Sequence, residues 1–171
     1  MNLLKIILQE HSKAQMQRIV TYVGADKKKF AELISLFLAG SYRVTQRTAW
    51  PLSYCAEQHP ELIKPHLKKI IDFLGKPDEH DAVRRNILRV FQFIPIPKSL
   101  QGKMVNLCFT FLSDGKQPVA IRVFAMTVLA NIAKENPELK NEIIPLVEDQ
   151  MPFGSAGFRS RGRKVLQGLK G

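Results

Sequence analysis

One pattern of apolar residues recurs four times along this chain of 171 residues. Its copies begin at Val44, Val83, Ile121 and Phe158, and the starts are therefore 39, 38 and 37 residues apart. Within a copy, apolar residues return every three to four positions, which places them on one face of an α-helix. A repeat of this length indicates a solenoid made of stacked helical units.

A second amphipathic segment precedes each copy, so the chain reads as a series of helical pairs. Pro60, Pro97 and Pro137 stand where the first helix of a pair is expected to begin, a position that tolerates the missing N–H of proline. No segment alternates with a period of two, and we expect no strands. The four preceding helices are predicted at Phe30 to Leu38, Glu61 to Leu74, Leu100 to Leu112 and Glu138 to Val147.

The N-terminal segment carries two further helices, a short one from Asn2 to Gln9 and a longer one from Ser12 to Val23. The terminal units of a solenoid have to cover the open end of its core, so we interpret this segment as a cap. The sequence thus predicts a single domain, with a cap at 1–26 and repeats at 27–59, 60–95, 96–135 and 136–171.

The third copy, with Ile121-Arg122 followed by Ala125, Leu129 and Ile132, resembles the second helix of a HEAT repeat. The resemblance covers about residues 27–171 and implies an all-α, right-handed α-solenoid of about four hairpins. It implies little about function, because HEAT-like arrays serve as scaffolds, transport adaptors, enzyme subunits and nucleic-acid binders.

The formal net charge is +11 and the sequence pI is near 9.9, so the surface attracts nucleic acid, an anionic membrane or an acidic protein face. Surplus charge that only keeps the protein soluble is the alternative. The two cysteines, Cys55 and Cys108, stand in apolar surroundings with no CxxC partner, so we expect core residues and no metal site, redox pair or cofactor. No signal peptide or membrane span is recognised, which predicts a cytoplasmic protein.

An arginine follows the first apolar residue in three copies, as Arg84, Arg122 and Arg159. In the HEAT family this arginine usually pairs with an aspartate shortly before it, and that structural role is the default interpretation here. The acid is missing from most copies, which leaves the arginines either to other acids such as Asp114 or Asp149, or to an anion. The residues four positions before the four starts are Gly40, Glu79, Gln117 and Gly154.

Two stretches, 82–113 and 151–171, contain Lys and Arg but no acid, whereas 134–149 between them carries five acids and two lysines. In HEAT-like arrays the second helices line the concave face, which would direct the cations of those helices into one groove. The third copy offers no charge there, because its equivalent residues are Val123, Phe124, Met126 and Thr127. An apolar centre with basic flanks favours a protein partner, whereas nucleic acid favours a continuous basic track. The expected groove cations are Arg47, Arg85, Arg89, Arg161, Arg163 and Lys164.

Trp50 and Tyr54 lie one turn apart in the first copy, beside Pro51. The pair could stack a base or anchor a peptide, but burial between helices is the favoured interpretation. Alkylpurine DNA glycosylases of the HEAT-like superfamily need a catalytic aspartate in a basic groove with aromatic residues. No copy of the pattern contains an aspartate and Glu57 is the only acid near Trp50, so this chemistry is a remote alternative.

The glycine-rich, basic segment from Gly154 to Lys164 lacks the order of residues of a phosphate-binding P-loop and predicts at most a nonspecific anion site. The sequence therefore predicts a non-enzymatic binding or scaffold module for an acidic or mixed acidic–apolar protein partner. A nucleic-acid binder with two basic patches is the alternative. The predicted binding residues are Arg47, Trp50, Arg85, Arg89, Phe124, Arg159, Arg161, Arg163 and Lys164.

Overall fold

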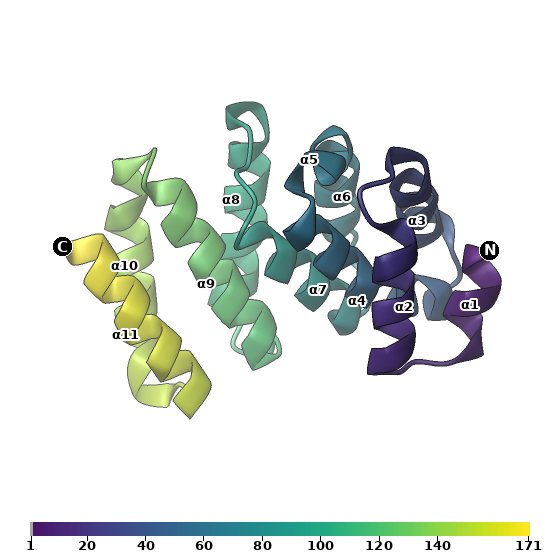
Figure 1. Cartoon of the computed structure of the whole chain (residues 1–171). Helices are drawn as coiled ribbons and strands as arrows, with labels where there is room; N and C mark the ends of the chain where they lie inside the picture. Colours follow the sequence, from purple (N-terminus) through teal and green to yellow (C-terminus); the bar gives the residue numbers. More distant parts are fainter. Residues whose placement is uncertain (1) are drawn as a thin grey trace. The chain divides into compact units, whose positions relative to one another are not determined.

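The computed structural model describes residues 2–171, which form helices joined by short turns and contain no strand (Figure 1). The helices fall into two compact units that meet in sequence between Ile94 and Pro95. This boundary lies next to residue 95, the predicted end of the second repeat. The all-α fold class is confirmed, and the division of a single domain into a cap and four repeats stays a prediction.

The N-terminal unit begins with the two helices that the sequence predicts there, α1 (Leu3–Gln9) and α2 (Lys13–Val23). The side chains of Asn2 and Ser12 accept hydrogen bonds from backbone N–H groups of the first turns, which satisfies donors that have no partner within the helix. Both helices pack against α4 (Tyr42–Gln58).

Two helical hairpins complete this unit. The first pairs α3 (Lys27–Ala39) with α4, and α4 also packs against α7 (Asp81–Phe91) of the second hairpin. The predicted helix from Glu61 to Leu74 is interrupted, because Pro65 lacks an N–H and a 3-10 turn replaces the α-helix around it. The pieces are α5 (Pro60–Ile63), η1 (Lys64–His66) and α6 (Leu67–Leu74).

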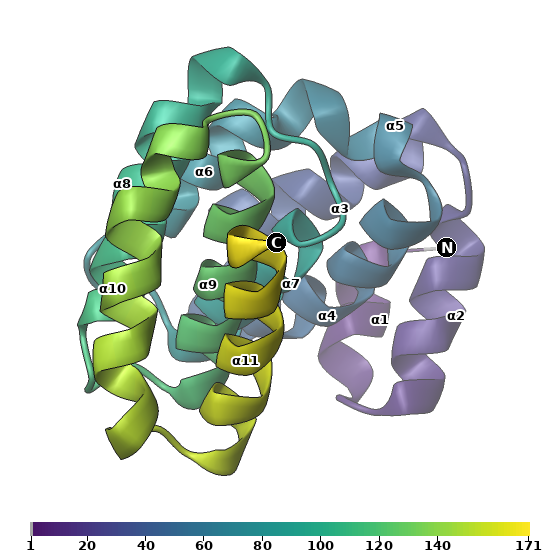
Figure 2. The same cartoon turned by 90° about the vertical axis from the view of Figure 1, so that its left-hand side faces the viewer.

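The C-terminal unit contains two further hairpins, in which α9 contacts both α8 and α11 (Figure 2). Pro137 begins a 3-10 turn, and a second such turn carries the chain between the last two helices. Its elements are α8 (Lys98–Ser113), α9 (Val119–Ala133), η2 (Pro137–Leu139), α10 (Lys140–Gln150), η3 (Met151–Phe153) and α11 (Ala156–Lys170).

The repeat pattern is the core pattern of both units. The four starting residues are at most 5% exposed, and the residue in the slot eleven positions later is at most 6% exposed in every copy. Cys55 occupies that slot in the first copy and is 1% exposed, which confirms its assignment as a small core residue. The other occupants of the slot are Ile94, Ile132 and Leu169.

Two of the starting residues fold back over the turn that precedes them. A Cβ atom added to Gly40 would lie 2.6 Å from Val44 Cγ1, and one added to Gly154 would lie 2.6 Å from Phe158 Cδ1. Real Cβ atoms do not approach other atoms so closely, so glycine is required by packing at both positions. These are two of the three copies that have no acid four residues before the start.

Candidate partner-binding surfaces

The arginines of the repeat register serve the scaffold in two of the three copies. Arg84 donates hydrogen bonds from Nη2 to the carbonyl oxygens of Lys76 and Pro77, at 2.9 and 2.7 Å. These carbonyls belong to the turn between α6 and α7, so Arg84 fixes the geometry of its own hairpin. Arg159, in contrast, is exposed on α11.

Arg122 links two successive hairpins of the C-terminal unit. Its guanidinium donates a hydrogen bond to Gln150 Oε1 and lies 4.6 Å from the centre of the Phe158 ring. Burial lowers the pKa of Arg122, whereas the charge of Asp114 acts in the opposite direction. Asp114, which the sequence offered as one possible acid for this register, has its own pKa lowered mainly by the backbone N–H of Lys116, with a smaller contribution from Arg122.

Arg47 joins α4 to the end of α1. Its Nη1 donates to the carbonyl oxygen of Leu8 at 2.8 Å and to that of Ile7 at 3.4 Å. These carbonyls lie in the last turn of α1, where they have no partner within the helix. The predicted binding residue Arg47 is thus half-buried and holds the N-terminal helices to the first hairpin.

Trp50 is half-buried on α4, and its ring centre lies 5.6 Å from that of His11 in the turn between α1 and α2. The space beside it, lined by Arg47 and Pro51 among others, measures only about 10 Å³. That space is too small for a base or a peptide side chain.

Arg89 connects α7 to α4 through two side chains. Its guanidinium carbon lies 4.7 Å from the centre of the Tyr54 ring, and its Nε is 3.4 Å from Glu57 Oε1. The hydrogen bond and the charge of Arg89 lower the pKa of Tyr54. Glu57, the only acid near Trp50 in sequence, is thereby engaged in an ion pair between helices.

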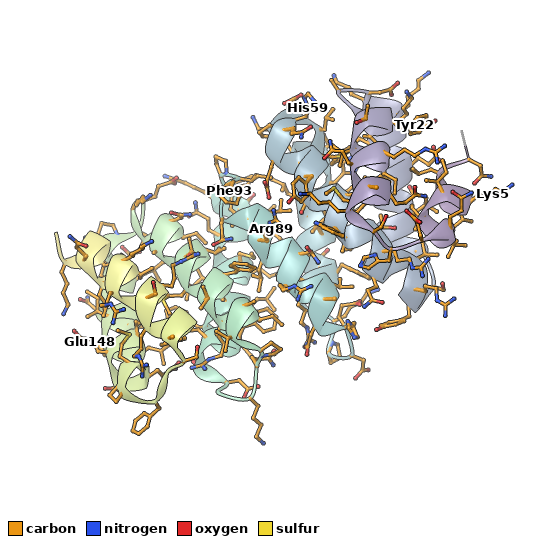
Figure 3. The ribbon with its side chains drawn as sticks, turned by 60° about the horizontal axis from the view of Figure 1, so that its bottom comes forward. Lys5, Tyr22, His59, Arg89, Phe93 and Glu148 are labelled. Carbon is orange, nitrogen blue, oxygen red and sulfur yellow. The ribbon has the colours of Figure 1, made fainter. Side chains whose placement is uncertain are left out.

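Two side chains on either side of Arg89 are open to solvent. Arg85, one turn earlier on α7, is exposed, and Phe93, four residues after Arg89, is 64% exposed. Figure 3 labels Arg89 and Phe93. Sequence reasoning included Arg85 and missed Phe93, although the four-residue spacing of the three residues was visible.

The prediction for the third copy was partly wrong. Val123 is 8% exposed and Met126 is fully buried, so neither contributes to a surface. Phe124 and Thr127 are half-buried and can be reached by a partner. The difference arises because α9 packs against α8 and α11, which leaves only a narrow strip of its surface uncovered.

A pocket of about 510 Å³ lies between α9 and α11 and extends to the start of α10. Arg161 crosses from α11 to α9, where its Nη1 donates a 2.6 Å hydrogen bond to Thr127 Oγ1. Four cationic side chains and an apolar floor line the pocket, and among the described residues that form it none is acidic. The lining consists of Thr127, Ala130, Asn131, Ala133, Lys134, Pro137, Lys140, Arg161, Lys164, Val165, Gly168 and Leu169.

The pocket contains two of the predicted binding residues, Arg161 and Lys164. Sequence reasoning missed Lys134 and Lys140, because they are the two lysines of the stretch that carries five acids. Thr127, Asn131 and Lys134 are spaced three to four residues apart, which places them on one side of α9 and its C-terminal cap. This spacing could have indicated that they line one surface. The predicted Arg159 and Arg163 are exposed one turn apart on α11, outside the pocket lining.

Other classes of site receive no support from the described residues. Residues 2–171 contain no group of three or more His, Cys, Asp or Glu side chains that could hold a metal ion. No helix in the same range is both long and apolar enough to cross a membrane.

Comparisons with known proteins agree with this architecture. The family model described as HEAT repeat domain matches residues 4–169. No curated protein matches the chain significantly. Among solved structures, the crystal structure of an engineered protein from the Northeast Structural Genomics Consortium is similar with a TM-score of 0.64 and 17% identity, over 98% of this chain and 79% of that one. This likeness supports the fold alone, and the family match shows that the chain is a helical-repeat protein of the HEAT repeat family.

Proposed function

We propose that the chain is a non-enzymatic scaffold that engages an acidic or mixed acidic–apolar protein partner through the exposed faces of its second helices. In the N-terminal unit Arg85 on α7 and Phe93, two residues after its end, are exposed, and Trp50 on α4 and Arg89 on α7 are half-buried. In the C-terminal unit the second-helix face offers the strip of α9 that includes Phe124 and the cations of α11. Arginine and aromatic side chains of this kind dominate the binding energy of protein interfaces.

The observation that carries this proposal is that the cations do not form a continuous track. Arg47 donates hydrogen bonds to carbonyl oxygens of α1, and Arg89 pairs with Glu57 and lies over the ring of Tyr54. The uncovered strip of α9 is uncharged at Phe124 and Thr127. Nucleic acid binds most tightly where successive phosphates each meet a cation. Cations separated by aromatic and apolar groups suit the mixed surface of a protein.

Affinity capture from a cell extract tests the proposal, with and without nuclease treatment. We expect a protein partner that survives nuclease and is weakened by Arg85→Glu or Lys164→Glu. Lys5→Glu is the matched control, because it makes the same charge change at an exposed residue of α1, which is not one of the second helices. A partner that is captured only through nucleic acid, or that is equally sensitive to the control, would contradict the proposal.

Nucleic-acid binding is the second candidate, because Arg85, Arg159 and Arg163 are exposed and the net charge is +11. It predicts that mixed-sequence DNA or RNA binds with a steep dependence on salt, and that Arg85→Glu and Arg163→Glu reduce both the affinity and the slope. Under the scaffold proposal, binding to either polymer is weak at physiological salt.

The remote glycosylase alternative lacks a carboxylate in position, since Glu57 is paired with Arg89. Excess protein incubated with alkylated DNA should release no base. Release of a base that is lost in a Glu57→Gln variant would establish the enzyme instead.

A further inference from the structure

We propose that the pocket between α9 and α11 binds a short acidic segment of a partner protein, with a carboxylate at Arg161 and an apolar side chain on the pocket floor. This inference rests on the proposed function, and it names the part of the second-helix face that recognises the partner. It also names the chemistry of the partner: an Asp or Glu close in sequence to an apolar residue.

The charge of the pocket selects an anion. Lys134, Lys140, Arg161 and Lys164 come from three different helical segments and converge on one space, with no acid among the described residues lining it. Arg161 is held across the gap by its 2.6 Å hydrogen bond to Thr127, so its direction is set before a ligand arrives. An arginine oriented in this way loses little further freedom on pairing with a carboxylate.

The floor of the pocket selects an apolar group beside the anion. Ala133, Val165 and Leu169 are at most 8% exposed, and their outer edges form the floor together with Ala130 and Pro137. The pocket lining includes small residues that leave space for a ligand group. In particular, no atom lies within 4 Å of the place where a Cβ of Gly168 would be.

The same lining disfavours nucleic acid as the occupant. No aromatic side chain lines the pocket, so a base would have no ring on which to stack. A phosphate chain could pair with the cations but would leave the apolar floor uncovered. A volume of about 510 Å³ lies in the range of preformed ligand pockets and accommodates one or two side chains of a peptide.

Selection of short random peptides displayed on phage, with the 171-residue chain as bait, tests the inference directly. We expect enriched peptides to contain Asp or Glu next to an apolar residue. Synthetic versions of these peptides are then measured by fluorescence anisotropy against two pairs of variants, with a mixed-sequence oligonucleotide as the competing probe and gel filtration to detect self-association.

The first pair compares Gly168→Phe with Gly102→Phe. Both glycines lie inside helices of the C-terminal unit with nothing within 4 Å of an added Cβ, but only Gly168 lines the pocket. Filling the pocket should raise the Kd at least about tenfold, while Gly102→Phe should leave it unchanged. Circular dichroism should show both variants to be folded, since no atom lies within 4 Å of the Cβ added at either position.

The second pair compares Lys164→Glu with Arg159→Glu, two equal charge changes on α11 of which only the first is in the pocket. Lys164→Glu should weaken the peptide at least about tenfold and Arg159→Glu much less. Equal effects of this pair, or no effect of Gly168→Phe, would overturn the pocket while leaving a more diffuse protein-binding face intact. Enrichment of no acidic–apolar peptide, with tight binding of the oligonucleotide, would overturn both the pocket and the proposed function. Self-association that the selected peptides do not compete with would assign the pocket to a second copy of the chain and refute the inference.

Discussion

Alanine at Gly40 should destabilise this protein, although alanine is the better residue in most helical settings. Gly40 ends α3, and a Cβ at this position would meet the carbonyl oxygen of Leu36 and lie 2.6 and 2.8 Å from Cγ1 and Cβ of Val44. The carbonyl is part of the helix backbone, and valine has one strongly preferred side-chain rotamer in a helix. Neither neighbour can move without a shift of α3 against α4.

The size of the effect follows from two opposing contributions. Forcing an extra carbon into a packed site typically costs about 1–3 kcal/mol. Alanine also reduces the freedom of the unfolded chain, which stabilises the folded state by about 0.4–1 kcal/mol, because the φ of −71° at Gly40 suits alanine. We therefore expect the free energy of unfolding to fall by about 1–2 kcal/mol, which for a chain of 171 residues lowers Tm by about 2–8 °C.

Two further glycines provide the controls. Gly154→Ala should also destabilise, because its Cβ would lie 2.6 Å from the buried Phe158 ring, which the guanidinium of Arg122 covers. Gly102 lies within α8 with no atom near an added Cβ, so Gly102→Ala should stabilise the protein by about 0.5–1 kcal/mol.

Urea unfolding followed by circular dichroism measures all three variants, with thermal melting as a second probe. The dependence of the free energy on urea concentration should stay unchanged, since none of the substitutions alters the surface exposed on unfolding. The reasoning is refuted if Gly40→Ala is as stable as the wild type, or if Gly102→Ala loses as much stability as Gly40→Ala.

Three other predictions concern ionisable groups. Burial raises the pKa of the Cys55 thiol to about 12 and also raises that of the Cys108 thiol. Neither thiol should therefore react with a thiol reagent near pH 8 until the protein unfolds. Rapid labelling of the native protein would contradict their burial. In Arg89→Met the pKa of Tyr54 should return upward toward 10.0. Because a lowered tyrosine pKa stabilises the folded state only at high pH, the variant should become less stable than the wild type as the pH rises toward and above that value. Ultraviolet titration measures the pKa and melting curves measure the stability, and an unchanged tyrosine titration would count against the contact. Asp26 accepts two backbone hydrogen bonds that lower its pKa, so Asp26→Ala should reduce Tm at neutral pH. The difference in Tm between the variant and the wild type should vanish as the pH falls below 3.8 through the lowered pKa of Asp26. A difference that persists in acid would rule out this cause.

The sequence predicted the helices and the core well because both depend on the spacing of apolar residues. Cys55 could be placed in the core only because Ile94 and Ile132 occupy the same slot in other copies. The break at Pro65 was equally visible in the sequence but was not used. The chemistry of proline, rather than the repeat, determines the 3-10 turn at that point.

The exposed face was harder to predict, because exposure depends on which helices are neighbours. Ala49, Met126 and Arg163 occupy the same position, five residues after their starts. Ala49 and Met126 are buried, since α4 and α9 have helices packed on both sides, whereas Arg163 on α11 is exposed. Alignment of the copies alone could not distinguish these environments.

The basic pocket could not be predicted for a related reason. Lys134 and Lys140 lie among acids in the sequence, and local charge counts assigned them to an acidic stretch. In the fold, the end of α9 and the start of α10 turn these two lysines toward Arg161 and Lys164, while Glu148 of the same stretch pairs with Lys170. Net charge along the sequence therefore says little about charge at a surface in this protein.

The arginine register shows why a repeated cation is weak evidence for binding. In the third copy, which lacks the family's aspartate, the register arginine is still engaged within the protein: Arg122 donates to a glutamine oxygen and lies over an aromatic ring in the next hairpin. Arg84, in the copy that does carry an acid, bonds to backbone carbonyls. A guanidinium can accept any of these partners because it presents several donors and a flat face. The residues that inform on function are consequently the cations outside the register, and in the C-terminal unit those that converge on one pocket are Lys134, Lys140, Arg161 and Lys164.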